Sequence, residues 1–181
     1  MLRRFAVALL TVLALAPAVR AEQILHVAPL PRDGELLVSF RLAQTLTPEL
    51  RKVIHSGLLL RFVYKVQLKR QSAIWMDRVM AAAEVTASIK YDTLTRRYYL
   101  SRTIDGRIES SPDPTDDEEF AWSWVTAQFR NLPLFHGVRL EPNAEYYVHV
   151  RAHTTSPPNT SFVWPWQGSD VVGFAKFTFI R

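Results

Sequence analysis

The sequence contains no cysteine among its 181 residues. This absence excludes disulfide bonds, cysteine-ligated zinc, iron–sulfur clusters, thiolate nucleophiles and a lipid-modified N-terminal cysteine. No glycine-rich phosphate-binding loop occurs either. The hydrophobic fraction of 48% is nevertheless high enough for a packed core and too high for a disordered chain. A chain of this length favours a single domain.

The first segment, residues 1–21, reads MLRRFAVALLTVLALAPAVRA. Two arginines precede an apolar run over residues 5–16, and short side chains around Ala21 fit a signal-peptidase site. This arrangement is typical of a cleavable secretory signal, with cleavage expected between Ala21 and Glu22. The apolar run is shorter than the about 20 residues of a spanning helix, which disfavours an uncleaved anchor. The sequence therefore predicts export to the periplasm.

Removal of this signal would change the charge balance. The whole chain has 22 basic and 17 acidic residues, a net charge of +5. The signal holds three arginines and no acid, so residues 22–181 keep 19 basic residues against 17 acidic ones, a net of +2. A nearly neutral exported protein is a poor candidate for nucleic-acid binding, and we exclude that class. Residues 51–107 still hold 12 basic and 4 acidic residues, which predicts a positive docking surface.

Alternation of apolar and polar residues dominates the chain after the signal. This pattern predicts a mainly β protein, with residues 22–181 forming one domain. We expect an antiparallel β-sandwich of about seven or eight strands with two short helices. The expected strands cover residues 25–30, 35–42, 58–68, 75–91, 96–104, 107–111, 145–153 and 171–180. Asp105 and Gly106 give the strongest turn signal in the chain.

Capping residues predict where the two helices begin. Thr47 and the proline after it begin a first helix of about ten residues, which Gly57 ends. Thr115 to Glu118 resembles a capping box and begins a second helix.

This second helix is expected to continue to about Asn131 because apolar residues recur at i,i+4 spacing. Trp122 and Trp124 would then point to opposite sides, with one packed and the other exposed or at an interface.

The expected hairpins place charged residues opposite one another. Folding the strand 58–68 onto the strand 75–91 about residues 72–73 predicts Arg61 opposite Glu84. Folding the next pair about residues 93–94 predicts Lys90 opposite Arg97. A like-charge pair at this position is unfavourable, so it would favour an anionic partner or a nearby acid.

The histidines and the acidic run do not predict a metal site. His149 and His153 share a strand face but would lie roughly 13 Å apart, too far for one ion. No His-Glu-x-x-His spacing occurs. The acidic residues 113–119 lack the spacing of a calcium loop and are explained by helix capping. The sequence predicts no metal and no cofactor.

Enzymatic motifs are also absent from the sequence. No Gly-x-Ser-x-Gly nucleophile elbow occurs, and no two carboxylates stand out as a glycosidase pair. The prediction is therefore that the protein is not an enzyme. Because a Ser/His/Asp set is assembled in space, a cell-envelope hydrolase remains an alternative.

The segment 162–170, FVWPWQGSD, is the most unusual part of the chain. Trp164 and Trp166 flank a proline and could project as a rigid apolar group that binds a sugar, a peptide or a membrane surface. The favoured interpretation is that both rings fold inward and close one end of the sandwich, because exposed aromatic surface of this size would be sticky.

Three segments resemble a known family. They are YDTLTRRYYLSR (residues 91–102), LEPNAEYYVHVRA (residues 140–152), and FVWPWQGSD with the ending FAKFTFIR. Together they are similar to the bacterial domain-of-unknown-function family numbered 4390, over essentially all of residues 22–181. The resemblance implies an exported protein without an assigned activity. It also implies, by genome neighbourhood, frequent association with a nitrogen-regulation-type membrane sensor kinase.

The leading hypothesis is a non-enzymatic periplasmic interaction or ligand-binding module, accessory to such a membrane sensor kinase. Basic and aromatic groups together suit an anionic glycan, a lipid headgroup or an acidic protein surface. Besides the interaction module and the cell-envelope hydrolase, a third hypothesis is a small outer-membrane β-barrel, since strands of about ten alternating residues fit that class. The capped helices and the prolines disfavour it. The candidate binding residues are Lys90, Arg97, Tyr99, Trp164, Trp166 and Asp170.

Overall fold

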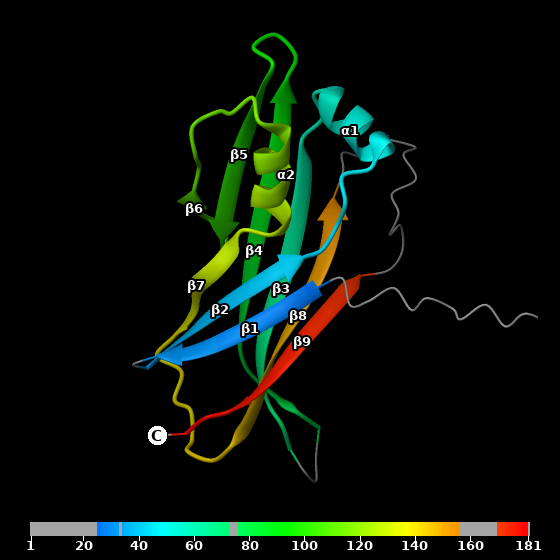
Figure 1. Cartoon of the computed structure of the whole chain (residues 1–181). Coiled ribbons are helices and arrows are strands. Elements are labelled where there is room, and N and C mark those ends of the chain that lie inside the picture. The colour runs from blue at the N-terminus through cyan, green and yellow to red at the C-terminus, as the bar shows by residue number, and fades with distance from the viewer. Residues whose placement is uncertain (1–24, 33, 73–75, 156–169, 181) are drawn as a thin grey trace, which may run out of the picture.

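The computed structural model describes residues 25–32, 34–72, 76–155 and 170–180 (Figure 1). The expected signal segment and its cleavage site, Ala21 and Glu22, lie outside the described residues. Within the described ranges, the chain is mainly β, with nine strands in two antiparallel sheets and two helices. The predicted sandwich-like class is confirmed. No helix in this part of the chain is long and apolar enough to span a bilayer.

The two sheets differ in size. The smaller has the order β1-β2-β7, and the larger has the order β6-β5-β4-β3-β8-β9. The strands of the smaller sheet are β1 (Leu25–Arg32), β2 (Glu35–Leu42) and β7 (Phe129–His136). The strands of the larger sheet are β3 (Leu60–Arg70), β4 (Arg78–Asp92), β5 (Arg97–Ile104), β6 (Arg107–Ser110), β8 (Glu145–Thr155) and β9 (Val171–Thr178).

The core lies between the sheets and contains one face of most of the strands, although β6 adds no side chain to it. Strand β3 has the alternation expected of a central strand, and its inward side chains from Leu60 to Leu68 are at most 2% exposed. The ring of Tyr64 lies 4.9 Å from that of Phe40 and 4.7 Å from that of Phe129. Its buried hydroxyl donates a hydrogen bond of 2.8 Å to the carbonyl of Val125, so this polar atom is satisfied.

The first helix begins and ends as its sequence predicts. Helix α1 (Pro48–His55) is capped by Thr47, whose side chain accepts the N–H of Leu50. Gly57 follows with a φ of +81°, a conformation that glycine adopts without strain. The helix buries Leu50 and Ile54 and lies against β4.

The second helix begins later and ends earlier than predicted. Helix α2 (Glu118–Thr126) is capped by Asp117, which accepts the N–H of Phe120. The helix does not reach Asn131, because the chain turns at residues 127–128 and pairs with β2 as strand β7. Asn131 has a φ of +48° and lies beside an irregularity in the pairing of β2 with β7. Irregularities of this kind are common on edge strands such as β7.

Both tryptophans of α2 are buried, so the prediction that one is exposed was wrong. Trp122 is 7% exposed and its indole N–H donates to the carbonyl of Gln44 at 2.8 Å. Trp124 is 6% exposed and faces β5. The helix lies against β4 and β5 on the core face of the larger sheet, and the side chains of both tryptophans are therefore covered (Figure 1).

The hairpin registers differ from the predicted ones because both hairpins are centred further along the chain than predicted. Glu84 lies opposite Lys65 instead of Arg61. The β4–β5 turn consists of residues 93–96, with Arg96 at a φ of +56°, and is centred on residues 94–95 instead of 93–94. Arg97 therefore lies opposite Asp92, and the predicted like-charge pair of Lys90 with Arg97 does not form.

The core contains one charged side chain, among the described residues, that is largely withdrawn from solvent. The guanidinium of Arg102 on β5 lies 4.4 Å from the ring of Trp124 and 4.6 Å from the ring of Phe129. It donates to the carbonyls of Trp124 and Gln128 at 3.3 and 3.0 Å, and Glu109 lies 3.6 Å away. Burial lowers the pKa of Arg102, and the nearby Glu109 opposes that shift. Arg102 thus ties the end of α2 to β5.

The substitution Arg102→Met should lower the free energy of unfolding by about 2–4 kcal/mol, because two charge-assisted hydrogen bonds and two cation–π contacts disappear. The same substitution at Arg97, an exposed position on the same strand, should change it by less than about 0.5 kcal/mol. Urea unfolding of the two variants and the parent measures the difference. Equal effects of the two substitutions would contradict the structural role of Arg102.

Candidate functional site

The outer face of the larger sheet, opposite the core, carries seven cationic side chains, five of them from the central region 51–107. We call the cationic residues on it the basic face, and they come from five neighbouring strands. They are Arg61, Lys65 and Lys69 on β3, Lys90 on β4, Arg97 on β5, Arg151 on β8 and Lys176 on β9. They occupy positions that alternate with the buried residues of the same strands, which is why they share one side.

Two of these cations lie directly side by side. Lys65 is opposite Arg151 in the pairing of β3 with β8. Like charges in this position repel unless other charges compensate them. Glu84 lies opposite Lys65 on its other side, and Asp170 Oδ2 lies 3.3 Å from Arg151 Nη1. Two carboxylates therefore bracket the cation pair.

A second row contains an aromatic ring between two lysines. Tyr147 lies opposite Lys69 on one side and Lys176 on the other, and the Lys69 Nζ is 5.8 Å from its ring centroid. The Tyr147 hydroxyl donates to Asp77 Oδ2 at 2.8 Å. Hydrogen bonds from the Ser72 N–H and the Tyr147 hydroxyl, together with the two lysines, lower the pKa of Asp77. The Asp77 carboxylate therefore stays charged and offsets one of the two cations.

His149 lies between these two rows. It is opposite Gln67 on β3 and Phe174 on β9. Burial lowers the pKa of His149, and the charges of Lys69 and Arg151 lower it further. The ring also forms part of a shallow hollow of about 340 Å³, which is lined by Gln71, Ser72, Asp77, Tyr147, His149, Phe174 and Lys176.

The charges of this surface do not cancel. Among the described residues, the seven cations of the basic face are met by five carboxylates, Asp77, Glu84, Asp92, Glu145 and Asp170, which leaves a surplus of two positive charges. Phe174 is 52% exposed and Tyr99 is 43% exposed on the same face. The surface therefore combines a positive surplus with exposed aromatic rings.

The structure brings some of the predicted site residues together and separates others. Lys90 and Tyr99 lie directly opposite each other on the basic face. Arg97 is on the same face but pairs across the strands with Asp92. Asp170 is exposed and contacts Arg151 at the far side of the sheet. Trp164 and Trp166 lie outside the described residues.

The residues at the centre of the basic face were not among the predicted ones. Alternation already indicates that Lys65 and Lys69 share a face. Their neighbours Tyr147 and Arg151 are about 80 to 90 residues away in the sequence, and no local signal indicates that β8 pairs with β3.

A separate cluster joins a histidine to a carboxylate and a hydroxyl. His55 Nε2 lies 2.8 Å from the Tyr98 hydroxyl and 3.1 Å from Glu118 Oε1, and Arg51 donates to the same carboxylate at 2.7 Å. Burial and Glu118 raise the pKa of Tyr98, which disfavours its use as a nucleophile. Because these contacts connect α1, α2 and β5, the cluster fastens the helices to the sheet.

Among the residues that the structure describes, no group of three or more histidine, aspartate or glutamate side chains is placed to hold a metal ion.

The chain matches a known protein family. The domain-of-unknown-function family 4390 matches residues 23–156. The chain belongs to this family. The matched range includes two of the three segments that carry the resemblance, and the segment 162–170 lies beyond it. No curated protein and no solved structure matches the chain.

In a titration followed by nuclear magnetic resonance, the midpoint of His149 should lie below the ordinary value of 6.5. The substitution Lys69→Met should raise this midpoint, because one of the charges that oppose protonation is removed. Lys52→Met on α1 is the control and should leave it unchanged. An unchanged midpoint in Lys69→Met would contradict the placement of the two side chains.

The same shift has a consequence for stability. The folded state binds the His149 proton more weakly than the unfolded chain does. The contribution of this residue to stability is therefore fully present above the unfolded pKa and is lost as the pH falls through 6.5 toward the lower folded pKa.

Proposed function

We propose that the protein is an exported, non-enzymatic interaction module that docks through its basic face onto an acidic protein surface in the bacterial envelope. In this proposal the partner is a membrane-bound sensor kinase of the nitrogen-regulation type, and the protein is its periplasmic accessory. Export is supported by the N-terminal sequence, in which a basic start, an apolar run and short residues precede Ala21.

The observation that carries the docking proposal is the positive surplus around exposed aromatic rings. A cationic surface steers an acidic partner and fixes its orientation more than it adds affinity. Aromatic and arginine side chains are enriched at the buried centres of protein interfaces. Phe174 and Tyr99 supply the rings, and Arg151 supplies a guanidinium between Lys65 and Asp170.

The carboxylates on this face have a defined part in the proposal. Asp170 pairs with Arg151, and Glu84 lies opposite Lys65, while the surface is free. An acidic partner would compete for the same cations, so docking would exchange one set of ion pairs for another. Exposed ion pairs contribute only about 0–1 kcal/mol each, so this exchange costs little.

The test is site-specific photocrosslinking in living cells, with the crosslinker at Tyr99 or at Phe174. We expect both positions to capture the same envelope protein. A crosslinker at Leu30, which is 49% exposed on the smaller sheet, is the matched control and should not capture it.

The decisive measurement combines this capture with charge reversal. The pair Lys65→Glu and Arg151→Glu should abolish capture, because attraction becomes repulsion, whereas Arg41→Glu and Arg130→Glu on the smaller sheet should leave it intact. Capture that survives reversal on the basic face would contradict the proposal. A different pair of results would favour a glycan as the ligand instead. Capture would be lost when a soluble anionic polysaccharide such as heparin is added, and no crosslinked protein would be recovered after purification.

A further inference from the structure

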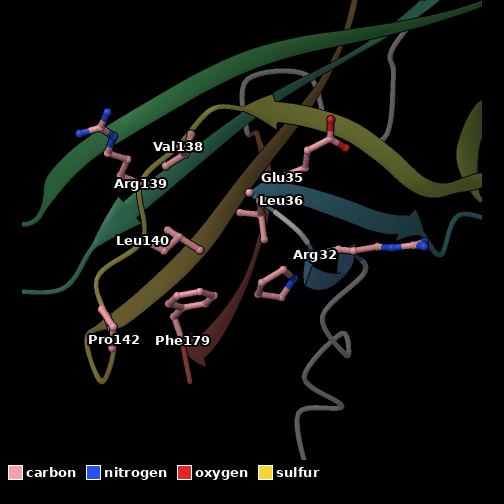
Figure 2. Close-up of a pocket in the computed structure, with 10 residues that line it drawn as sticks. Arg32, Glu35, Leu36, Val138, Arg139, Leu140, Pro142 and Phe179 are labelled. Carbon is pink, nitrogen blue, oxygen red and sulfur yellow. The ribbon is translucent and has the colours of Figure 1, made fainter. Parts of the chain in front are cut away.

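A large hollow lies at the end of the sandwich that is far from the helices. Its volume is about 820 Å³, within the range of about 300–1,000 Å³ typical of small-molecule sites. Three segments that are distant in the sequence form it. They are the hairpin end between β1 and β2, the connection from β7 to β8, and the residue that follows β9 (Figure 2).

The interior of this hollow, which we call the end cavity, is apolar. Figure 2 shows Leu36, Leu140 and Phe179 converging on it. Val138, Leu140 and Phe179 pack against the core but are only partly buried. The core therefore does not end in a polar cap here, and apolar side chains face open space. The remaining apolar lining is Pro31 and Pro142.

The wall of the end cavity is held in place by polar contacts outside it. Arg70 binds both carboxylate oxygens of Glu141, at 2.6 and 2.7 Å. The N–H of Glu141 donates to the buried Tyr146 hydroxyl at 2.8 Å, and the N–H of Asn143 donates to the carbonyl of Phe179 at 2.8 Å. The apolar wall is thus fixed before any ligand enters, which reduces the entropic cost of binding.

The charged side chains among the described lining residues lie at the mouth of the cavity. The side chains of Arg32 and Arg139 lead away from the apolar interior on opposite sides (Figure 2). Glu35 lies opposite Arg32 across the hairpin and its carboxylate is 3.0 Å from His136 Nδ1. Arg139 is exposed and makes no ion pair with any residue that the structure describes. Among the described residues of the mouth, Glu35 therefore offsets Arg32 and leaves the positive charge of Arg139.

We propose that the end cavity binds a single-chain amphiphile with an anionic head group, with the alkyl chain against Leu140 and Phe179 and the head group at Arg139. The apolar interior matches the alkyl chain, and the positive mouth matches the head group. This site is independent of the basic face, which lies on the outer side of the larger sheet. A carboxylate and a phosphate offer the same anionic oxygens, so both head groups fit.

The alkyl-chain part of the proposal is tested by isothermal titration calorimetry of the full-length protein. The ligands are octanoate, decanoate and dodecanoate, each below its critical micelle concentration. We expect affinity to rise by about fourfold for each added CH₂ until the cavity is filled. Dodecyl phosphate and dodecanoate distinguish the two head groups. Absence of binding by every chain, or affinity that does not change with chain length, would overturn the proposal.

Two variants test the placement. Leu140→Trp should fill the cavity and abolish binding, whereas Leu94→Trp, at a position that is 92% exposed in the β4–β5 turn, should not. Arg139→Glu should lower the affinity for dodecanoate by about fivefold or more, and it should change the affinity for an uncharged dodecyl ligand by no more than about twofold. Arg130→Glu on β7 is the matched charge control. Equal losses in Arg139→Glu and Arg130→Glu, or for charged and uncharged ligands, would contradict the head-group assignment.

A direct measurement keeps the proposal testable even where Leu140→Trp does not fold. Addition of dodecanoate should shift the ring resonances of Phe179 and give contacts between that ring and the alkyl chain. Phe120, exposed on α2, should be unaffected. Shifts at Phe120 alone would overturn the site. In a contrary result, sedimentation would show that the protein self-associates, that Leu140→Trp blocks the association, and that no ligand binds. This result would assign the cavity to a second copy of the chain and reject the amphiphile.

Discussion

Strand β3 pairs over its length with β4 on one side and with β8 on the other, and the two faces of the protein depend on this double pairing. Because side chains alternate across a strand, the register that buries Tyr64 and Val66 also places Lys65 and Lys69 on the outside. A slip of one residue would exchange the core with the charged surface. The hydrophobic effect therefore fixes the geometry of the basic face, although none of its cations takes part in the core.

Local patterns were enough to predict most of the strands. Alternation located β3, β4 and β5, and the Asp105-Gly106 turn has positive φ at both residues, as a tight hairpin requires. Strand β7 was missed because residues 118–131 combine helix caps with i,i+4 apolar pairs, so the helical pattern continues past the true end of α2. Pairing with β2, which lies about 95 residues earlier, decides the conformation there.

The candidate site was harder to predict than the fold for a related reason. The positive charge of residues 51–107 is visible in the sequence, and Lys90 and Tyr99 do share the predicted face. The partners that compensate or extend that charge depend on register and on which strands are neighbours. The β4–β5 turn is centred one residue later than predicted, which places Asp92, and not Lys90, beside Arg97. Likewise, the end cavity is formed by three distant segments, and no single segment indicates a hollow.

The order of the strands has a consequence for how the chain folds. His153 lies opposite Val63, 90 residues earlier, and Phe135 lies opposite Leu36, 99 residues earlier. Pairings at such separation raise the contact order, and sandwiches of this kind fold in milliseconds to seconds. Folding is slow because the entropic cost of closing long loops comes before the stabilising contacts form. Neither sheet can be completed until the C-terminal half of the chain is present. A protein with this topology stays unfolded during its synthesis for longer than a chain of local hairpins would.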